Sequence, residues 1–67
     1  MNKYPTIRKQ QIKNIENLGY KFIDLNLYDS ESQILTILNK HKEITKIRFL
    51  NSNFHIDMNR LFKGENV

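Results

Sequence analysis

Gly19 divides the first 28 residues into a helical pattern and a strand pattern. Before it, three apolar residues recur at the spacing of one face of an α-helix: Ile12, Ile15 and Leu18. After it, apolar and polar residues alternate from residue 23 to residue 28, as in a strand with one buried face. We therefore predict a helix at about residues 7–18, capped by Thr6 and ended by Gly19, and then a strand at residues 20–28.

Two aromatic residues do not fit the alternation of this strand. Tyr20 and Phe22 fall in phase with its polar positions, not with its apolar ones. Either a β-bulge near Phe22 and Ile23 corrects the phase, or both rings stand on the less buried face of the sheet. The sequence leaves these two alternatives open.

The segment that follows has the pattern of a second helix. Ser30 and Gln33 have the spacing of a capping box. Apolar residues then recur at helical spacing, and basic residues suit the negative end of a helix dipole. The residues concerned are Ile34, Leu35, Ile37 and Leu38, followed by Lys40, His41 and Lys42. We expect a helix at about residues 31–42.

The last part of the chain has the pattern of a β-hairpin, with strands at residues 44–50 and 54–58. A two-residue loop at Asn51 and Ser52 places every apolar pair on one face and every polar pair on the other. The expected pairs are Phe49 with Phe54, Ile47 with Ile56, Arg48 with His55 and Lys46 with Asp57. Residues 57–63 either form a short helical turn, capped by Asp57 and closed by Gly64, or extend the last strand.

These elements predict one small domain over residues 1–67, of the α+β class and in the order α-β-α-β-β. A strand, a helix and a strand joined by short connections favour a parallel crossover, and the hairpin adds an antiparallel strand. We expect two helices packed on one face of a small three-stranded mixed sheet. A chain of this size buries only about 60% of the surface that its unfolded form exposes, so a partner or self-association would add stability.

The composition weakens arguments from residue counts and excludes several classes of site. The chain has no Ala, Trp or Cys. It has nine Asn, nine Ile and eight Lys, and these three residue types are encoded by A- and T-rich codons. A phage or other mobile element of an AT-rich host would have such a composition. The absence of Cys excludes disulfides and the commonest zinc sites, and we expect no metal and no cofactor. There is neither an apolar run of about 20 residues nor a signal-peptide core, so we expect a cytoplasmic protein without membrane contact.

The net charge of +4 is distributed unevenly along the chain. The first predicted helix and residues 40–48 are basic, and residues 24–31 are acidic. Basic side chains and amides can contact phosphates and base edges, so a nucleic acid is one candidate partner. The candidate nucleic-acid-binding residues are Arg8, Lys9, Lys13, Lys46 and Arg48.

A second candidate surface is the sheet face that the helices leave uncovered. The expected register places aromatic residues beside cations there, a combination that is enriched in protein interfaces and can also stack unpaired bases. The candidate partner-binding residues are Tyr20, Phe22, Tyr28, Lys46, Arg48 and His55. We expect a small non-enzymatic module that acts as a protein–protein adaptor or inhibitor, with self-association as one form of partner binding. The alternative is a nucleic-acid-binding regulator that uses the basic helix and the open sheet face.

Neither of the two enzymatic patterns in the sequence is specific. Arg48, His55 and Asp57 could in principle support acid–base chemistry, but alternating polar residues on a solvent-exposed strand often produce such groups of side chains. The stretch NLGYKF at residues 17–22 resembles the opening of the small HicA-type toxins, and this resemblance covers about residues 12–22. It implies a double-stranded-RNA-binding-like fold and a catalytic His. The corresponding region here, IDLNLYDS, has no His, and the expected second helix interrupts the sheet where that family continues it.

Overall fold

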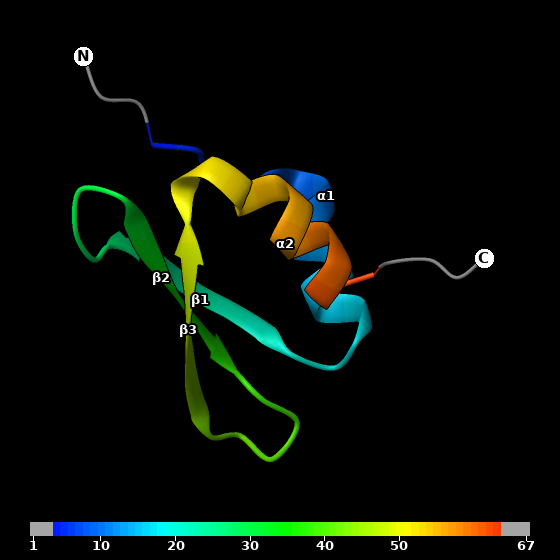
Figure 1. The fold of residues 1–67 in the computed structure, drawn as a ribbon. Helices are drawn as coiled ribbons and strands as arrows, with labels where there is room; N and C mark the ends of the chain where they lie inside the picture. The colour runs from blue at the N-terminus through cyan, green and yellow to red at the C-terminus, as the bar shows by residue number, and fades with distance from the viewer. Residues whose placement is uncertain (1–3, 64–67) are drawn as a thin grey trace.

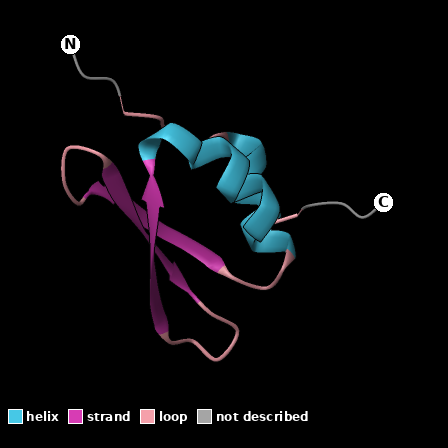
Figure 2. Cartoon of the chain, viewed as in Figure 1, coloured by secondary structure: helices cyan, strands magenta, loops and turns pink. Residues whose placement is uncertain are grey.

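The computed structural model describes residues 4–63 and contains one antiparallel sheet and two α-helices. The elements are α1 (Lys9–Asn17), β1 (Lys21–Leu27), β2 (Ser32–Leu38), β3 (Ile44–Leu50), the 3₁₀-helix η1 (Asn51–Asn53) and α2 (Phe54–Leu61). The strands lie side by side in the order β1-β2-β3, with both pairings antiparallel. Both α-helices pack on the same face of this sheet (Figure 1). The molecule therefore has two layers, and Figure 2 shows that the other face of the sheet carries neither helix.

The expected order α-β-α-β-β and the mixed sheet are wrong, because the segment predicted as the second helix is strand β2. Its apolar run suits one face of a helix, but it suits equally well a central strand with apolar residues on both faces. Leu35 and Ile37 are buried toward the helices. Ile34 and Leu38 are half-buried on the other face.

Of the two residues predicted to cap that helix, Ser30 lies in the turn between β1 and β2, and Gln33 lies in β2. The carboxylate Oδ1 of Asp29 accepts hydrogen bonds from the backbone N–H of Glu31 and from the hydroxyl of Ser32, each at 2.8 Å. The amide of Gln33 donates to the carbonyl of Pro5 at 2.9 Å and to Oδ1 of Asn51 at 3.0 Å. Gln33 thus connects β2 to the segments that precede α1 and follow β3.

The basic residues expected at the end of the second helix lie in the turn between β2 and β3. The side-chain oxygen of Asn39 accepts hydrogen bonds from the backbone N–H groups of His41 and Glu43, at 2.8 and 3.0 Å. Lys42 has a φ of +64°, in the left-handed region that a tight turn requires. Local side-chain bonds to the backbone favour turns over helices.

The predicted first helix, first strand and strand at residues 44–50 are confirmed, but the predicted helix cap is wrong. Helix α1 lies within the predicted range, although Arg8 and not Thr6 takes the cap position, with its backbone N–H donating to Gln11 Oε1 at 2.9 Å. Gly19 has a φ of +93°, which only glycine adopts at no steric cost. Strand β1 has the β-bulge, between Phe22 and Asp24, so of the two alternatives the bulge is the one observed. Strand β3 has the predicted bounds.

The predicted last strand at residues 54–58 is wrong, since these residues lie in helix α2. The structure buries residues at intervals of four, Phe54, Met58 and Phe62, whereas Ile56 is 57% exposed. The predicted hairpin pairs therefore do not form. Asp57 lies inside α2, not at its cap, and the helix ends at Leu61, while Gly64 lies outside the described residues.

The core lies between the sheet and the two helices. It comprises Ile15, Leu35, Ile37, Phe49, Phe54, Met58 and Phe62. The rings of Phe49 and Phe54 meet edge to face, with centroids 5.6 Å apart, which joins β3 to α2.

Substitutions at residues 54 and 56 separate the helix from the predicted strand. We expect Phe54→Ala to lower the free energy of unfolding by about 3–5 kcal/mol, because it empties a buried site. We expect Ile56→Ala to change it by less than about 0.5 kcal/mol, because this side chain is exposed. Urea unfolding followed by circular dichroism measures both. Phe54→Leu, with a smaller loss of volume, provides a folded comparison. In a strand the two residues would share a face, so equal losses would contradict α2.

Candidate functional site

The register of the strand pairs arranges the side chains of the uncovered sheet face in four rows that run across the strands. The first row is Lys21, Leu38 and Ile44; the second is Asp24, Thr36 and Lys46; the third is Asn26, Ile34 and Arg48; the fourth is Ser32 and Leu50, with Tyr28 beside Ser32. We call these twelve residues the open face. Side chains alternate along a strand, so they project away from Leu35, Ile37 and Phe49 in the core.

The open face carries aliphatic residues on β2 and β3 and charged residues on its two edge strands. Four aliphatic residues lie on it, Ile34 and Leu38 on β2 and Ile44 and Leu50 on β3, and the last two are 58% and 44% exposed. Lys46 and Arg48 make the β3 edge basic. On the β1 edge, the carboxylate of Asp24 accepts hydrogen bonds from the backbone N–H of Leu25 and from the side-chain amide of Asn26, at 2.8 and 3.1 Å. One edge is therefore cationic, and the other carries an acid at the level of Lys46.

Arg48 is held in position by three neighbours. Its Nη2 lies 3.5 Å from Oδ2 of Asp29, and its Nε donates to the hydroxyl of buried Ser32 at 3.1 Å. Its guanidinium carbon lies 5.1 Å from the centre of the Tyr28 ring, which is a cation–π arrangement. The ionic side chains of Arg48 and Asp29 are 54% and 44% exposed, so water and salt screen the pair and it contributes little to stability. Its effect is to fix the orientation of an Arg and a Tyr on the open face.

The turn that carries Asp29 keeps this residue ionised. The backbone N–H of Glu31 has the largest effect, followed by the hydroxyl of Ser32, and together with Arg48 they hold the pKa of Asp29 below its usual value of 3.8. Protonation of Asp29 would therefore weaken both the turn and the contact with Arg48.

The structure brings together three of the six predicted partner-binding residues. Tyr28, Lys46 and Arg48 lie on the open face. Tyr20 and Phe22 pack against the core on the helix side, and the Tyr20 ring meets that of Phe62 edge to face, with centroids 6.1 Å apart.

His55, the sixth residue, lies on α2 and makes a polar contact between the two helices. Its Nδ1 is 3.0 Å from Nε2 of buried Gln11, which also donates to Oδ1 of Asn59 at 3.3 Å. Because the amide nitrogen is the donor, Nδ1 of His55 acts as the acceptor and the ring is neutral in this arrangement. Burial, and then the charge of Arg8, lower the pKa of His55 from its usual 6.5.

The five candidate nucleic-acid-binding residues lie on two separate sides of the molecule. Arg8, Lys9 and Lys13 are exposed at or near the start of α1, which packs on the helix side of the sheet. Lys46 and Arg48 project from the opposite face. The sheet therefore separates the two basic groups.

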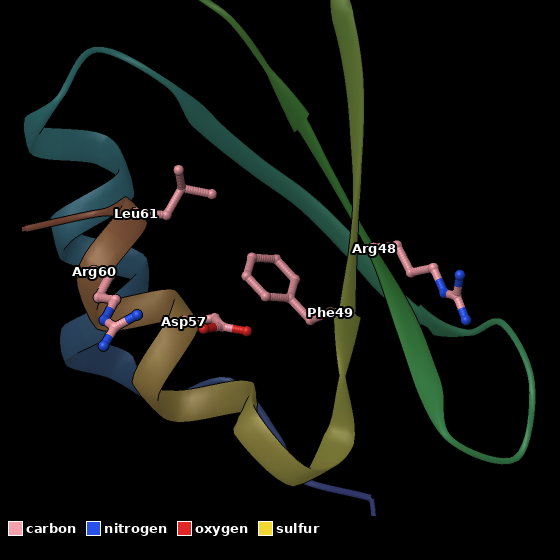
Figure 3. A pocket seen from close by; sticks show the side chains of 5 residues that line it. All are labelled: Arg48, Phe49, Asp57, Arg60 and Leu61. Carbon is pink, nitrogen blue, oxygen red and sulfur yellow. The ribbon is translucent and has the colours of Figure 1, made fainter.

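Two hollows lie on the helix side, both beside Leu61. The first, of about 320 Å³, is lined by Arg48, Phe49, Asp57, Arg60 and Leu61. Figure 3 shows that Phe49 points from β3 toward α2, whereas the side chain of Arg48 points away from the hollow. The second hollow, of about 280 Å³, is mainly apolar and is lined by Leu18, Tyr20, Ile37, Asn39, Thr45, Ile47, Leu61 and Phe62.

The predicted set of Arg48, His55 and Asp57 is not assembled, since His55 contacts Gln11 between the helices and Arg48 lies on the open face. Within residues 4–63, no group of three or more His, Cys, Asp or Glu side chains could hold a metal ion. Over the same range, no helix is long and apolar enough to cross a membrane.

Comparisons with protein-family models, with curated proteins and with solved structures found no significant match to this chain. The sheet does continue through β2, where the sequence predicted an interrupting helix, so one of the two departures from the HicA-type pattern is removed. The other remains, because β1 and the turn after it contain no His. No comparison extends the resemblance beyond about residues 12–22.

The aliphatic residues of the open face were missed by sequence reasoning. Ile44 and Leu50 share the phase of Lys46 and Arg48 in β3, and this phase was a usable signal, because a fully wet face would not begin and end with large apolar residues. Ile34 and Leu38 had no such signal as long as β2 was taken for a helix.

The lowered pKa of His55 predicts a loss of stability on acidification. In the unfolded chain this imidazole takes up a proton near pH 6.5, and in the folded chain only at lower pH. Between these two pKa values the unfolded state binds more protons than the folded state. The contribution of neutral His55 to the free energy of unfolding is therefore fully present above about pH 6.5 and is lost as the pH falls through the folded pKa. We expect the thermal midpoint of the wild type to fall between about pH 7.5 and about pH 5, and that of His55→Gln to fall less.

His41, exposed in the turn between β2 and β3, provides the matched control through His41→Gln. If both variants showed the same dependence on pH, the inferred role of the contact between Gln11 and His55 would be wrong.

Proposed function

We propose that this chain is a non-enzymatic protein-binding module that docks on a protein surface through the open face. The observation that carries the proposal is the aliphatic content of a sheet face that lies opposite both helices: Ile34, Leu38, Ile44 and Leu50. A solvated antiparallel face normally alternates apolar-in with polar-out. Exposed aliphatic residues gathered on one face, among polar ones, are typical of an interaction surface.

The position of Arg48 and Tyr28 also supports protein binding. Arg and Tyr are among the residue types that contribute most to protein interfaces. Here both are oriented before any partner arrives, through the contacts of Arg48 with Asp29 and Ser32. Such preorganisation lowers the conformational entropy that binding would otherwise cost. These contacts support the adaptor or inhibitor predicted from the sequence, although Arg48 and Tyr28 have other neighbours than the sequence predicted.

A nucleic-acid-binding regulator remains the second candidate, supported by the net charge of +4. A phosphate backbone needs a continuous basic track. The cations of α1 and β3 lie on two sides of the sheet, and those of β3 lie near Asp24 and Asp29. Protein binding is therefore the better supported of the two.

Site-specific photocrosslinking tests the proposal. Thr36 lies at the centre of the open face, so p-benzoylphenylalanine at this position should yield a protein adduct of discrete mass when cells that produce the chain are irradiated. The same photoreactive group at exposed Ile56, on α2, is the control and should not yield that adduct. Adding Ile34→Lys to the Thr36 probe should remove the adduct, because a charge would then replace an aliphatic residue of the open face next to the probe.

The result that would overturn the proposal is the absence of any protein adduct at residue 36. If this were accompanied by retention on mixed-sequence DNA or RNA that falls steeply with added salt, the nucleic-acid regulator would replace it.

A further inference from the structure

We infer that a second copy of this chain occupies the open face, packed face to face about a two-fold axis that runs parallel to the strands. This inference rests on the proposed function, because it uses the same face and names the partner. Its basis is that the open face is complementary to itself under this rotation, in charge and in apolar pattern.

The two-fold axis fixes which strands meet. It exchanges the two edges of the sheet, so β1 lies over β3 of the other copy and β2 lies over β2. It preserves position along the strands, so each of the four rows meets the same row of the other copy. Aligned sheets cross at about 30°, which keeps this pairing near the axis.

The second row gives the strongest pairing. Asp24, Thr36 and Lys46 share this row, with Asp24 and Lys46 at opposite edges. The rotation places Asp24 over Lys46 of the other copy, and it does so twice in the dimer. In each case the two carboxylate oxygens already accept hydrogen bonds from Leu25 and Asn26, which hold the acid on its edge. A row with opposite charges at its two ends therefore pairs acid with base when it meets the same row of the other copy.

The remaining rows also match. In the third row Ile34 meets Ile34 and the strand position of Arg48 lies over that of Asn26, while the guanidinium of Arg48 stays with Asp29 and Ser32 of its own chain. In the first row Leu38 meets Leu38. At its edges Lys21 covers Ile44 with its methylene chain and keeps its ammonium at the rim. In the fourth row Leu50 meets Tyr28, two exposed apolar groups.

The charges disfavour the other symmetric arrangements. An axis perpendicular to the strands, in the plane between the sheets, would stack β3 on β3 and bring Lys46 near Arg48 of the other copy. Edge-to-edge pairing of two β3 strands centred on Ile47 would place the same two cations opposite each other. Exchange of the edges pairs Asp24 with Lys46 of the other copy and keeps Lys46 away from Arg48 of that copy.

The size of the face predicts a weak dimer. Three strands about 4.8 Å apart and seven residues at about 3.4 Å each cover about 14 by 24 Å. Standard interfaces bury about 800 Å² on each partner, and smaller ones belong to weak or transient complexes. We expect a dissociation constant in the micromolar range, so that the association depends on protein concentration.

Charge exchange between two separate variants tests the arrangement. Sedimentation equilibrium of the wild type, from about 1 µM to about 1 mM, should show a reversible dimer. Lys46→Asp and Asp24→Lys should each raise the dissociation constant about tenfold or more, because each puts like charges together. An equimolar mixture of the two variants should restore association. In the mixed pair the introduced charges face each other on one side, and native Asp24 faces native Lys46 on the other.

Two control variants carry the same changes of charge outside the open face. Lys13→Asp and Glu16→Lys are exposed on α1 and should leave the dissociation constant within about twofold of the wild-type value. Circular dichroism confirms that every variant is folded. Recovery in the mixture separates a contact between copies from an effect within one chain, because neither protein in the mixture carries both substitutions.

Three results would overturn the inference. A wild type that stays monomeric at about 1 mM excludes a useful dimer. A dimer that both single variants leave unchanged packs through another surface. A mixture that stays as dissociated as its components excludes the exchanged edges. In any of these cases, a Thr36 adduct with a different protein would leave the proposed function standing, whereas a Thr36 probe without any protein adduct would remove both.

Discussion

The burial of Leu35 between two neighbouring strands and the helix layer determines the rest of this structure. Leu35 is fully buried at the middle of β2, paired with Leu25 on one side and Ile47 on the other. Because side chains alternate, this placement sends Ile34 and Thr36 to the opposite face. A shift of one residue would exchange the two faces along the whole strand. The open face is therefore a direct consequence of how the core forms in a chain with only two layers.

The local pattern was enough to predict α1, β1 and β3, but not β2 and α2. The first three have one clear periodicity each, interrupted in β1 only by the bulge after Phe22, and Gly19 marks the end of the first helix. The run in β2 is compatible with a helix and with a central strand, and only its two neighbours decide between them. In α2, Phe54, Ile56 and Met58 give a period of two, and the helix becomes visible only when Phe62 is included.

The same reasons explain how much of the candidate site was predictable. Lys46 and Arg48 could be placed on one face because β3 was identified with its correct bounds. Tyr20 and Phe22 were assigned to the wrong side because one extra residue in a bulge changes the face of everything before it. The placement of His55 was wrong because it depends on whether residues 54–58 form a strand or a helix. The contacts of Arg48 with Asp29 and Ser32 require a turn in a place where the sequence favoured a helix cap.

The distribution of charge explains why a basic chain need not be a nucleic-acid ligand. In the second row of the open face, Lys46 lies at one edge, Asp24 lies at the other, and Thr36 lies between them. Such a face is polarised across its width, so it repels an unrotated copy of itself and suits a partner that exchanges the edges. The same uncovered aliphatic residues then affect both folding and association. The uncovered Ile34 and Leu38 limit the stability of the single chain, and a partner that covers them raises the free energy of unfolding by mass action.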